Sequence, residues 1–263
     1  MNDNERLEDG PVSYFDETTS TMDEARSLAL AGAREGTVVV AGRQSAGRGR
    51  IGGRTWTAPP EEALLATVIL GAEKAVLPGL TLRIGLALAR ACEAAAAGAG
   101  SELRVAVKWP NDLLVDGRKL GGILCEAGPW GLLAGFGLNV AQRGFEGALE
   151  QRATSLAIET RPGAFPPEPW PGNRARLLGV ALREIGRALG EEGWRAAMEE
   201  RLWGRGRVED ISLGSPGAGP ALRARILGIG GNGALIVEDE GGGRREVLSG
   251  EYGTALTAER RII

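Results

Sequence analysis

Two stretches of this sequence concentrate the residue types that hold anions. The first is the loop 47–54 (GRGRIGGR), where glycines let the backbone approach a ligand and Arg48, Arg50 and Arg54 can bind carboxylate or phosphate oxygens. It contains a literal G-x-G-x-x-G, but residues 55–60 (TWTAPP) cannot begin the helix that a dinucleotide-binding loop requires. The loop also lacks the P-loop pattern. An anion site and a solvated arginine loop both remain open.

The second stretch runs from Lys108 to Glu126 (KWPNDLLVDGRKLGGILCE) and holds two of the three lysines. Pro110 ends a predicted strand and leaves Asn111 and Asp112 at its end. Lys119 begins another predicted strand, and we expect it to share a face with Gly121, Ile123 and Cys125. Because glycines leave room for a ligand, this pattern favours a site at the rim of a sheet. The alternative is that both lysines extend into solvent.

Four further residues are weaker candidates. Thr21 followed by Glu24 forms a capping box that accounts for Thr21, and the alternative to a functional role for Ser20 is simple exposure to solvent. Gln44 follows a predicted strand and is either a reader of a polar ligand or an ordinary loop residue. Asn139 lies in an apolar strand and needs hydrogen-bond partners from the backbone or from a ligand.

Composition limits the chemistry further. Lys+Arg of 31 against Asp+Glu of 34 gives a net charge of −3, which argues against a protein that holds nucleic acid by bulk charge. Histidine is absent, so histidine-ligated zinc and serine–histidine or cysteine–histidine nucleophile pairs are excluded. The two cysteines are far apart in apolar runs, where packing is their expected role. With no signal segment or long apolar run, a cytoplasmic protein that does not associate with a membrane is expected.

The order of predicted elements indicates an α+β protein. We expect helices at 20–33, 80–97, 173–189 and 192–202, and strands at 37–41, 64–70, 103–108, 113–115, 120–125 and 132–140. Four short strands at 208–213, 222–228, 234–238 and 245–248 predict a small β-barrel. The expected fold is therefore a mixed, mostly antiparallel sheet flanked by helices (1–205), followed by a small C-terminal β-barrel domain (206–263). The proline-rich run 162–171 is expected to be a loop.

Together these segments resemble one family. The stretches 20–25 (STMDEA), 44–50 (QSAGRGR), 108–112 (KWPND), 118–124 (RKLGGIL) and 137–140 (GLNV) look like the successive signatures of biotin–protein ligases, in the family's order and at similar spacing. The resemblance is strong over residues 12–160 and looser through the terminal strands. It implies a catalytic core like that of class II synthetases. It also implies an enzyme that makes biotinyl-5′-adenylate from biotin and ATP with Mg²⁺, then transfers biotin to one lysine of a biotin carboxyl carrier protein.

The resemblance also implies a role for each matching residue. Lys119, Arg48 and Arg50 would be catalytic. The biotin site would comprise Ser20, Thr21, Met22, Gln44, Arg48, Gly49, Arg50, Lys119, Gly121 and Gly122. The ATP and adenylate site would comprise Arg50, Arg54, Trp56, Lys108, Asn111, Asp112, Lys119 and Asn139. Asp112 would be the magnesium ligand and is a candidate base for the carrier lysine. Trp170, in the proline-rich run, is a candidate adenine partner.

Several alternatives stay open at this point. A lipoate– or octanoate–protein ligase would share the fold, and a binding regulator without turnover or a purely structural module would share the composition. Some family members also carry an N-terminal DNA-binding domain, but the signatures here begin at Ser20 and the pI is about 5.4. We therefore expect a monofunctional ligase that does not bind DNA. Pairing of two copies into a homodimer is possible.

Overall fold

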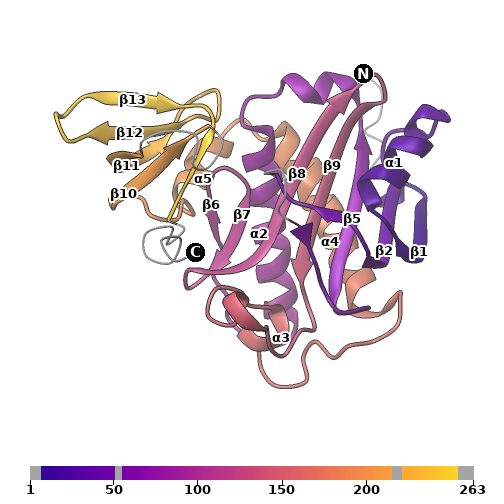
Figure 1. Ribbon diagram of the computed structural model, residues 1–263. Helices are drawn as coiled ribbons and strands as arrows, with labels where there is room; N and C mark the ends of the chain where they lie inside the picture. Colours follow the sequence, from indigo (N-terminus) through magenta and orange to yellow (C-terminus); the bar gives the residue numbers. More distant parts are fainter. Residues whose placement is uncertain (1–6, 51–54, 215–220, 254–263) are drawn as a thin grey trace, which may run out of the picture.

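The computed structural model describes residues 7–50, 55–214 and 221–253, and it contains two sheets of different size (Figure 1). The larger has seven strands in the order β1-β2-β5-β9-β8-β7-β6. Their bounds are β1 (Val12–Thr18), β2 (Val38–Gln44), β5 (Ala63–Leu70), β6 (Ala106–Lys108), β7 (Asp112–Val115), β8 (Arg118–Gly128) and β9 (Gly131–Asn139). Among the described strands of this sheet, only β1 and β2 pair in parallel. The prediction of a mixed, mostly antiparallel sheet is confirmed.

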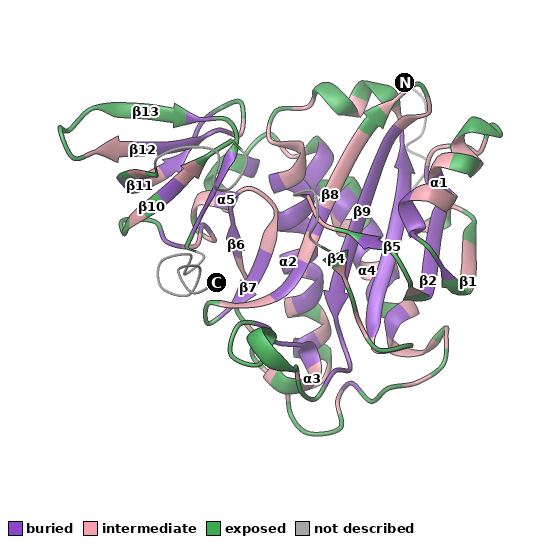
Figure 2. Ribbon diagram, viewed as in Figure 1, coloured by how far each residue is buried: buried purple, intermediate pink, exposed green. Residues whose placement is uncertain are grey.

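Helices cover both faces of this sheet. α1 (Thr21–Leu30) packs on one face, while α2 (Leu80–Gly98) and α4 (Gly172–Gly190) pack together on the other. β5 lies between them and is buried along its whole length, so its side chains alternate between the two layers (Figure 2). Leu64 and Val68 join the core under α2 and α4, whereas Ile69 joins the smaller core under α1.

The remaining helices are short. They are α3 (Leu156–Glu159) and α5 (Trp194–Glu199), with 3₁₀ turns at Leu7–Asp9, Ala72–Val76 and Gly147–Leu149. α5 is shorter than the predicted helix 192–202. Among the residues that the structure describes, none of the helices combines the length and the hydropathy needed to cross a membrane.

The N-terminal strand β1 was not predicted from the sequence. It lies at the edge of the sheet, and most of its side chains are exposed or half-buried, so its sequence lacks the apolar alternation of a covered strand. The glycine–arginine stretch 42–54 is predicted to contain no regular element, and its described residues differ from that prediction. Gly47–Arg48 (β3) and Thr55–Trp56 (β4) pair as two short antiparallel strands, and β2 continues to Gln44.

A bulge in β8 decides which residues share a face with Lys119. In the β7–β8 pairing, Leu113 lies opposite Gly121 but Leu114 lies opposite Lys119, so Leu120 is an extra residue. Because the bulge shifts the alternation by one position, Lys119 lies on the same face as Gly122. The prediction that Lys119 shares a face with Gly121, Ile123 and Cys125 is wrong. The preceding turn has positive φ at Asp116 (48°) and Gly117 (79°), as the Asp-Gly pair in the sequence favours.

The smaller sheet is antiparallel and follows β13-β12-β11-β10-β14. Its strands are β10 (Val208–Leu213), β11 (Leu222–Ile229), β12 (Leu235–Asp239), β13 (Arg244–Val247) and β14 (Gly250–Tyr252). Within the described residues β13 and β14 do not pair with each other, so the sheet stays open instead of closing into the expected barrel. The division of the chain at residue 205 stays a prediction.

Hydrogen bonds join this sheet to the preceding part of the chain. The indole Nε1 of Trp109 donates to the carbonyl of Gly233 at 3.1 Å, and the Tyr252 hydroxyl donates to the carbonyl of Trp203 at 2.7 Å. At the first of these contacts the two backbones nearly touch. A Cβ at Gly233 would lie 2.6 Å from the Cα of Gly79, and Gly233 has a φ of +88°.

Replacing Gly233 with alanine should therefore lower the free energy of unfolding by about 2–3 kcal/mol, because the left-handed backbone and the overlap with Gly79 both add strain. Gly231→Ala is the matched control in the same turn, since a Cβ there would meet no atom within 4 Å. Urea denaturation of both variants measures the difference. Equal stability of the two variants would contradict this description of the contact.

Candidate active site

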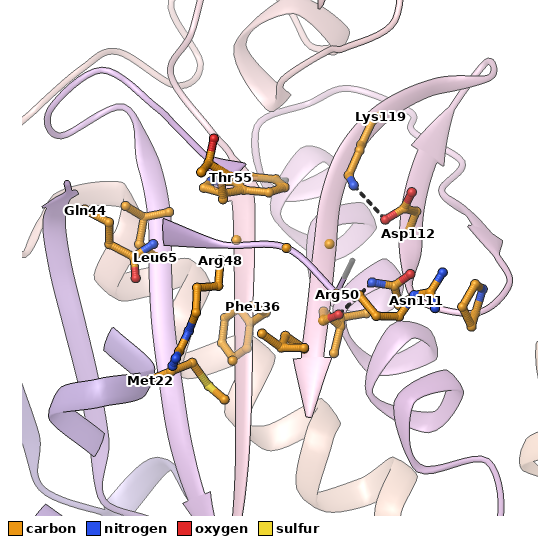
Figure 3. Close-up of a pocket in the computed structure, with 18 of the residues that line it drawn as sticks. Met22, Gln44, Arg48, Arg50, Thr55, Leu65, Asn111, Asp112, Lys119 and Phe136 are labelled. Carbon is orange, nitrogen blue, oxygen red and sulfur yellow. Dashed lines mark hydrogen bonds and ion pairs between the residues drawn. The ribbon is translucent and has the colours of Figure 1, made fainter. Parts of the chain in front are cut away.

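A pocket of about 400 Å³ opens on the face of the large sheet that carries α1 (Figure 3). Its wall comes from the start of α1, the segment 44–50, β4, the β6–β7 connection, β8, β9 and β14. Most of the sequence-predicted residues line it, namely Ser20, Thr21, Met22, Gln44, Arg48, Gly49, Arg50, Trp56, Lys108, Asn111, Asp112, Lys119 and Gly122. Arg54 lies outside the described residues.

One end of the pocket is polar and lies at the start of α1. Ser20, only 1% exposed, is the N-cap, and its Oγ accepts from the backbone N–H of Met22. The capping role that the sequence suggested for Thr21 therefore belongs to Ser20, which is buried rather than exposed. Because the Ser20 hydroxyl oxygen is the acceptor in the cap, its hydrogen is available for a ligand.

Thr21 orients Gln44 at this end. The backbone N–H and the hydroxyl of Thr21 both donate to Oε1 of Gln44, at 2.8 and 3.1 Å, while Thr67 on β5 donates to the Thr21 hydroxyl at 2.9 Å. Since the amide oxygen of Gln44 is held this way, its NH₂ group is left as the donor. Ser20 and Gln44 therefore present hydrogen-bond donors at the end of the pocket nearest α1.

The floor of the pocket is glycine. A Cβ at Gly135 would lie 2.7 Å from the sulfur of Met22, and one at Gly137 would lie 2.6 Å from the Trp56 ring. Gly122 lies beside them, next to Lys119. The alternate glycines of β9 were missed in the sequence, although a G-x-G inside an apolar strand is a signal for close approach.

Lys119 and Asp112 face each other across the β7–β8 pairing. The Lys119 ammonium lies 2.7 Å from Oδ1 of Asp112 (Figure 3). It also lies 5.6 Å from the centre of the Trp56 ring. Both residues line the pocket. The ion pair holds the lysine over the glycine floor, where its charge can stabilise an anionic ligand.

Lys108 is the second cation at this end, and it is only 6% exposed. Its ammonium lies 5.8 and 5.9 Å from the centres of the stacked rings of Trp203 and Tyr252, and it makes no hydrogen bond or ion pair with any described residue. Burial lowers the pKa of Lys108, and the charges of Asp112 and Glu251 act in the opposite direction. The site therefore holds a partly desolvated ammonium next to the pocket.

The smaller sheet contributes to this end as well. Arg50 donates from Nη2 to the carbonyl of Gly250 at 3.0 Å and lies 3.9 Å from the carboxylate of Glu251, which lines the pocket from β14. Glu251 was not singled out as a site residue in the sequence. Nothing in the local pattern of β14 indicates that the chain returns to a pocket built by residues 200 positions earlier.

Three predicted residues are not brought into the pocket. A Cβ at Gly121 would point at Leu138, on the face opposite Lys119. Asn139 donates to the carbonyls of Thr154 and Lys119 and accepts from Gln142, so its polar atoms are occupied by the protein. Trp170 stacks on Tyr14 of β1, with ring centres 5.3 Å apart, away from the pocket.

Three other side chains have structural roles. The Asn111 amide donates to the carbonyl of Ile123 at 2.8 Å. The cysteines are free thiols, and burial raises the pKa of Cys92 to about 12 and that of Cys125 to about 11. Because both stay protonated at neutral pH, neither is a nucleophile.

The pocket thus has two unlike ends joined by a glycine floor. Donors from Ser20 and Gln44 suit a carbonyl oxygen at one end. Cations from Lys119, Lys108 and Arg50 suit carboxylate or phosphate at the other. This arrangement fits an elongated molecule with a carbonyl-bearing head and an anionic tail, and it fits the joining of that tail to a second anion.

Comparison with known proteins agrees with this geometry. Residues 12–140 match the model of the biotin/lipoate A/B protein ligase family. The biotin–[acetyl-CoA-carboxylase] ligase of Mycobacterium tuberculosis is 31% identical over 247 residues, covering 89% of this chain and 84% of that protein. The chain therefore belongs to the biotin–protein ligase family.

Other relatives match over a shorter part of their length. The bifunctional ligase/repressor BirA of Bacillus spizizenii is 37% identical over 153 residues, which is 55% of this chain and 45% of that protein. This chain thus matches less than half the length of that relative.

Solved structures of the family share the fold over nearly the whole chain. The biotin protein ligase of Aquifex aeolicus in complex with biotin and ATP superposes with a TM-score of 0.76 at 26% identity, covering 92% of this chain and 97% of that one. The Leishmania major enzyme in complex with biotinyl-5-AMP gives 0.59 at 28% identity, covering 91% and 99%. This chain therefore has the fold of the family, with both the large sheet and the smaller C-terminal sheet.

Lys108 gives a test of the electrostatics. Because burial lowers its pKa, protonated Lys108 costs the folded state free energy at pH 7, and Lys108→Met should raise the free energy of unfolding there. The gain should shrink as the pH approaches about 10, where lysine loses its proton in the unfolded chain too.

The matched control is Lys74→Met, because an ion pair with Glu73 raises the pKa of Lys74 and its loss should not stabilise the protein. Urea denaturation at pH 7 and near pH 10 measures both variants. A Lys108→Met protein that is less stable than the wild type at pH 7 would contradict the burial argument.

Proposed function

We propose that this protein is a biotin–protein ligase, which joins biotin and ATP to biotinyl-5′-adenylate and transfers the biotinyl group to a lysine of a biotin carboxyl carrier protein. The observation that carries the proposal is the two-ended pocket, with donors from Ser20 and Gln44 at one end and cations at the other. Biotin has a ureido carbonyl at one end and a carboxylate at the other. These two polar ends match the two ends of the pocket.

The polar end favours biotin over lipoate. The head of lipoate is a dithiolane ring, which offers no strong acceptor, so the donors of Ser20 and Gln44 would be left unpaired behind it. Buried donors without partners cost about 1–3 kcal/mol each. A ureido carbonyl would accept from both. The same preference applies against octanoate, whose head is a methyl group.

In the first step a carboxylate oxygen of biotin attacks the α-phosphorus of ATP, and the bond to the β-phosphate breaks to release pyrophosphate. Two anions must approach each other for this, so the cations Lys119 and Arg50 stabilise the charge that builds on the α-phosphate. Since the adenylate is itself the activated species, no nucleophile from the protein is required. This agrees with the absence of histidine and with the protonated cysteines.

Two buried donors at this end support a polar ligand there. Among the described atoms, Nε1 of Trp56 and Nε of Arg50 are buried without a hydrogen-bond partner. Such groups are uncommon in a folded protein. We infer that the nucleotide side of the adenylate lies near Trp56, with Lys108 close to its phosphates.

Magnesium would enter with the nucleotide, where it neutralises phosphate charge. The described residues contain no group of three or more histidine, cysteine or carboxylate side chains that could hold a metal. This fits Mg²⁺ bound mainly by phosphates and water, as is usual in nucleotide sites. Asp112 is the carboxylate that would contact it.

In the second step the amine of the carrier lysine attacks the acyl carbon of the mixed anhydride. The carbon–oxygen bond to phosphate breaks, AMP leaves, and the amine loses one proton. Asp112 lies next to Lys119 and is our candidate to receive that proton. The carrier is a biotin carboxyl carrier domain of a biotin-dependent carboxylase.

Pyrophosphate exchange into ATP tests the first step. We expect exchange with biotin and little with lipoate, and a loss of about a hundredfold or more in Lys119→Ala, because removing one preorganised charge from such a site costs that much. Lys74→Ala is the control, since Lys74 pairs with Glu73 away from the pocket. Pyrophosphate exchange with lipoate but not with biotin would instead indicate a lipoate–protein ligase. Tight biotin binding without exchange would reduce it to a binding regulator.

Ser20→Ala tests the polar end separately. Biotin affinity should fall about tenfold or more, because the ureido carbonyl loses a donor in a buried site. Ser27→Ala is the control, a serine on the exposed side of the same helix. Titration calorimetry measures both, and an unchanged affinity in Ser20→Ala would contradict this placement of the ureido group.

A further inference from the structure

The guanidinium of Arg48 is directed at protein carboxylates. Its Nη2 lies 2.9 Å from Oδ1 of Asp23, in the first turn of α1, and 3.9 Å from Oε1 of Glu126, in the middle of β8. Arg48 lines the pocket, and Figure 3 shows its side chain extending toward Met22 at the start of α1. Arg48 therefore differs from Arg50, which bonds to β14 at the opposite end.

Arg26 completes a closed set of four charges. Its two terminal nitrogens lie 2.6 Å from Asp23 and 2.6 Å from Glu126, and its guanidinium stacks 4.9 Å from the Trp130 ring. The side chain of Arg26 is only 24% exposed. Because Arg26 fixes both carboxylates, Arg48 meets two acceptors that are already in position.

The contacts of Arg48 are one of three attachments that hold the segment 44–50 in place. Backbone N–H groups of Ser45 and Ala46 donate to the carbonyls of Thr18 and Thr19, each at 2.9 Å, which holds the start of the segment. Arg50 holds its end. Between these points, Arg48 attaches by its side chain a short strand whose backbone, within the described residues, pairs only with Thr55 and Trp56.

We propose that Asp23 and Glu126 tether Arg48, and that this tether holds residues 47–50 across the mouth of the pocket. Arg48 is then a positioning residue, and Gly49 and Arg50 are the members of the segment that face the ligand. Given the proposed function, the tether slows the escape of biotin and of the activated adenylate before the carrier lysine arrives.

The first arm of the test needs no ligand. Amide hydrogen exchange at residues 47–50 should be faster in Asp23→Asn and in Arg48→Ala than in the wild type, because each variant removes the attachment. Glu17→Gln is the matched control, since Glu17 and Arg43 form an exposed pair at 3.1 Å elsewhere. Unchanged exchange in Arg48→Ala would overturn the tether, whatever the protein catalyses.

The second arm measures the dissociation rate of biotin by stopped flow. Asp23→Asn should raise it about two- to fivefold, the range expected for a partly exposed ion pair. Adding Asp23→Asn to Arg48→Ala should change little further, because both substitutions remove the same contact. The maximum rate of pyrophosphate exchange at saturating biotin should stay within about twofold of wild type in Asp23→Asn.

The two arms separate the two ideas. If the wild type neither binds biotin nor catalyses exchange, the proposed function fails while the exchange of amides 47–50 still decides the tether. A different result would contradict the tether: Asp23→Asn leaves the dissociation rate of biotin unchanged, but Arg48→Ala abolishes pyrophosphate exchange at saturating biotin. Arg48 would then contact the substrate directly.

Discussion

The structure depends on holding several cations close together in a partly buried pocket. The positive charges of Lys119 and Arg152 disfavour a protonated Lys108, and two carboxylates act in the opposite direction: Asp112, from the same hairpin as Lys119, and Glu251, from the smaller sheet. Because one carboxylate comes from each sheet, the charge balance needs both. The stacked rings of Trp203 and Tyr252 beside Lys108 also favour its charge, and they join the smaller sheet to the preceding part of the chain. The smaller sheet is thus part of the site and not an appendage.

The opposite end of the pocket follows from helix geometry. Burial of Ser20 as the N-cap places its hydroxyl at the start of α1, and the adjacent Thr21 holds Gln44 by its amide oxygen. Between the two ends, β8 and β9 supply glycines where any side chain would fill the space. The bulge at Leu120 brings Lys119 to the same face as these glycines. One strand irregularity therefore sets the cation on the face where a ligand can lie.

Much of this could be predicted from local pattern. Buried strands such as β5, the Asp116–Gly117 turn and the long helices follow from apolar periodicity and turn chemistry. The features that the sequence did not predict depend on contacts between residues that are distant in the chain. The edge strand β1 has no apolar alternation, the bulge is set by pairing with β7, and Glu251 enters the pocket only because the smaller sheet folds back. Asn139 was a candidate ligand residue, but it forms hydrogen bonds with Thr154 and Gln142. The sequence alone does not show that these partners lie next to it.

We propose above all that this pocket converts the biotin carboxylate to an adenylate and retains that adenylate until the carrier lysine reacts. Incubating the protein with biotin and ATP, removing free ligand by rapid gel filtration, and analysing the bound fraction by mass spectrometry tests it most directly. The account predicts one equivalent of biotinyl-5′-adenylate on the protein, which disappears when a biotin carboxyl carrier domain is added and gains one biotinyl group. Recovery of unreacted biotin and ATP, with no mixed anhydride under any condition, would contradict it.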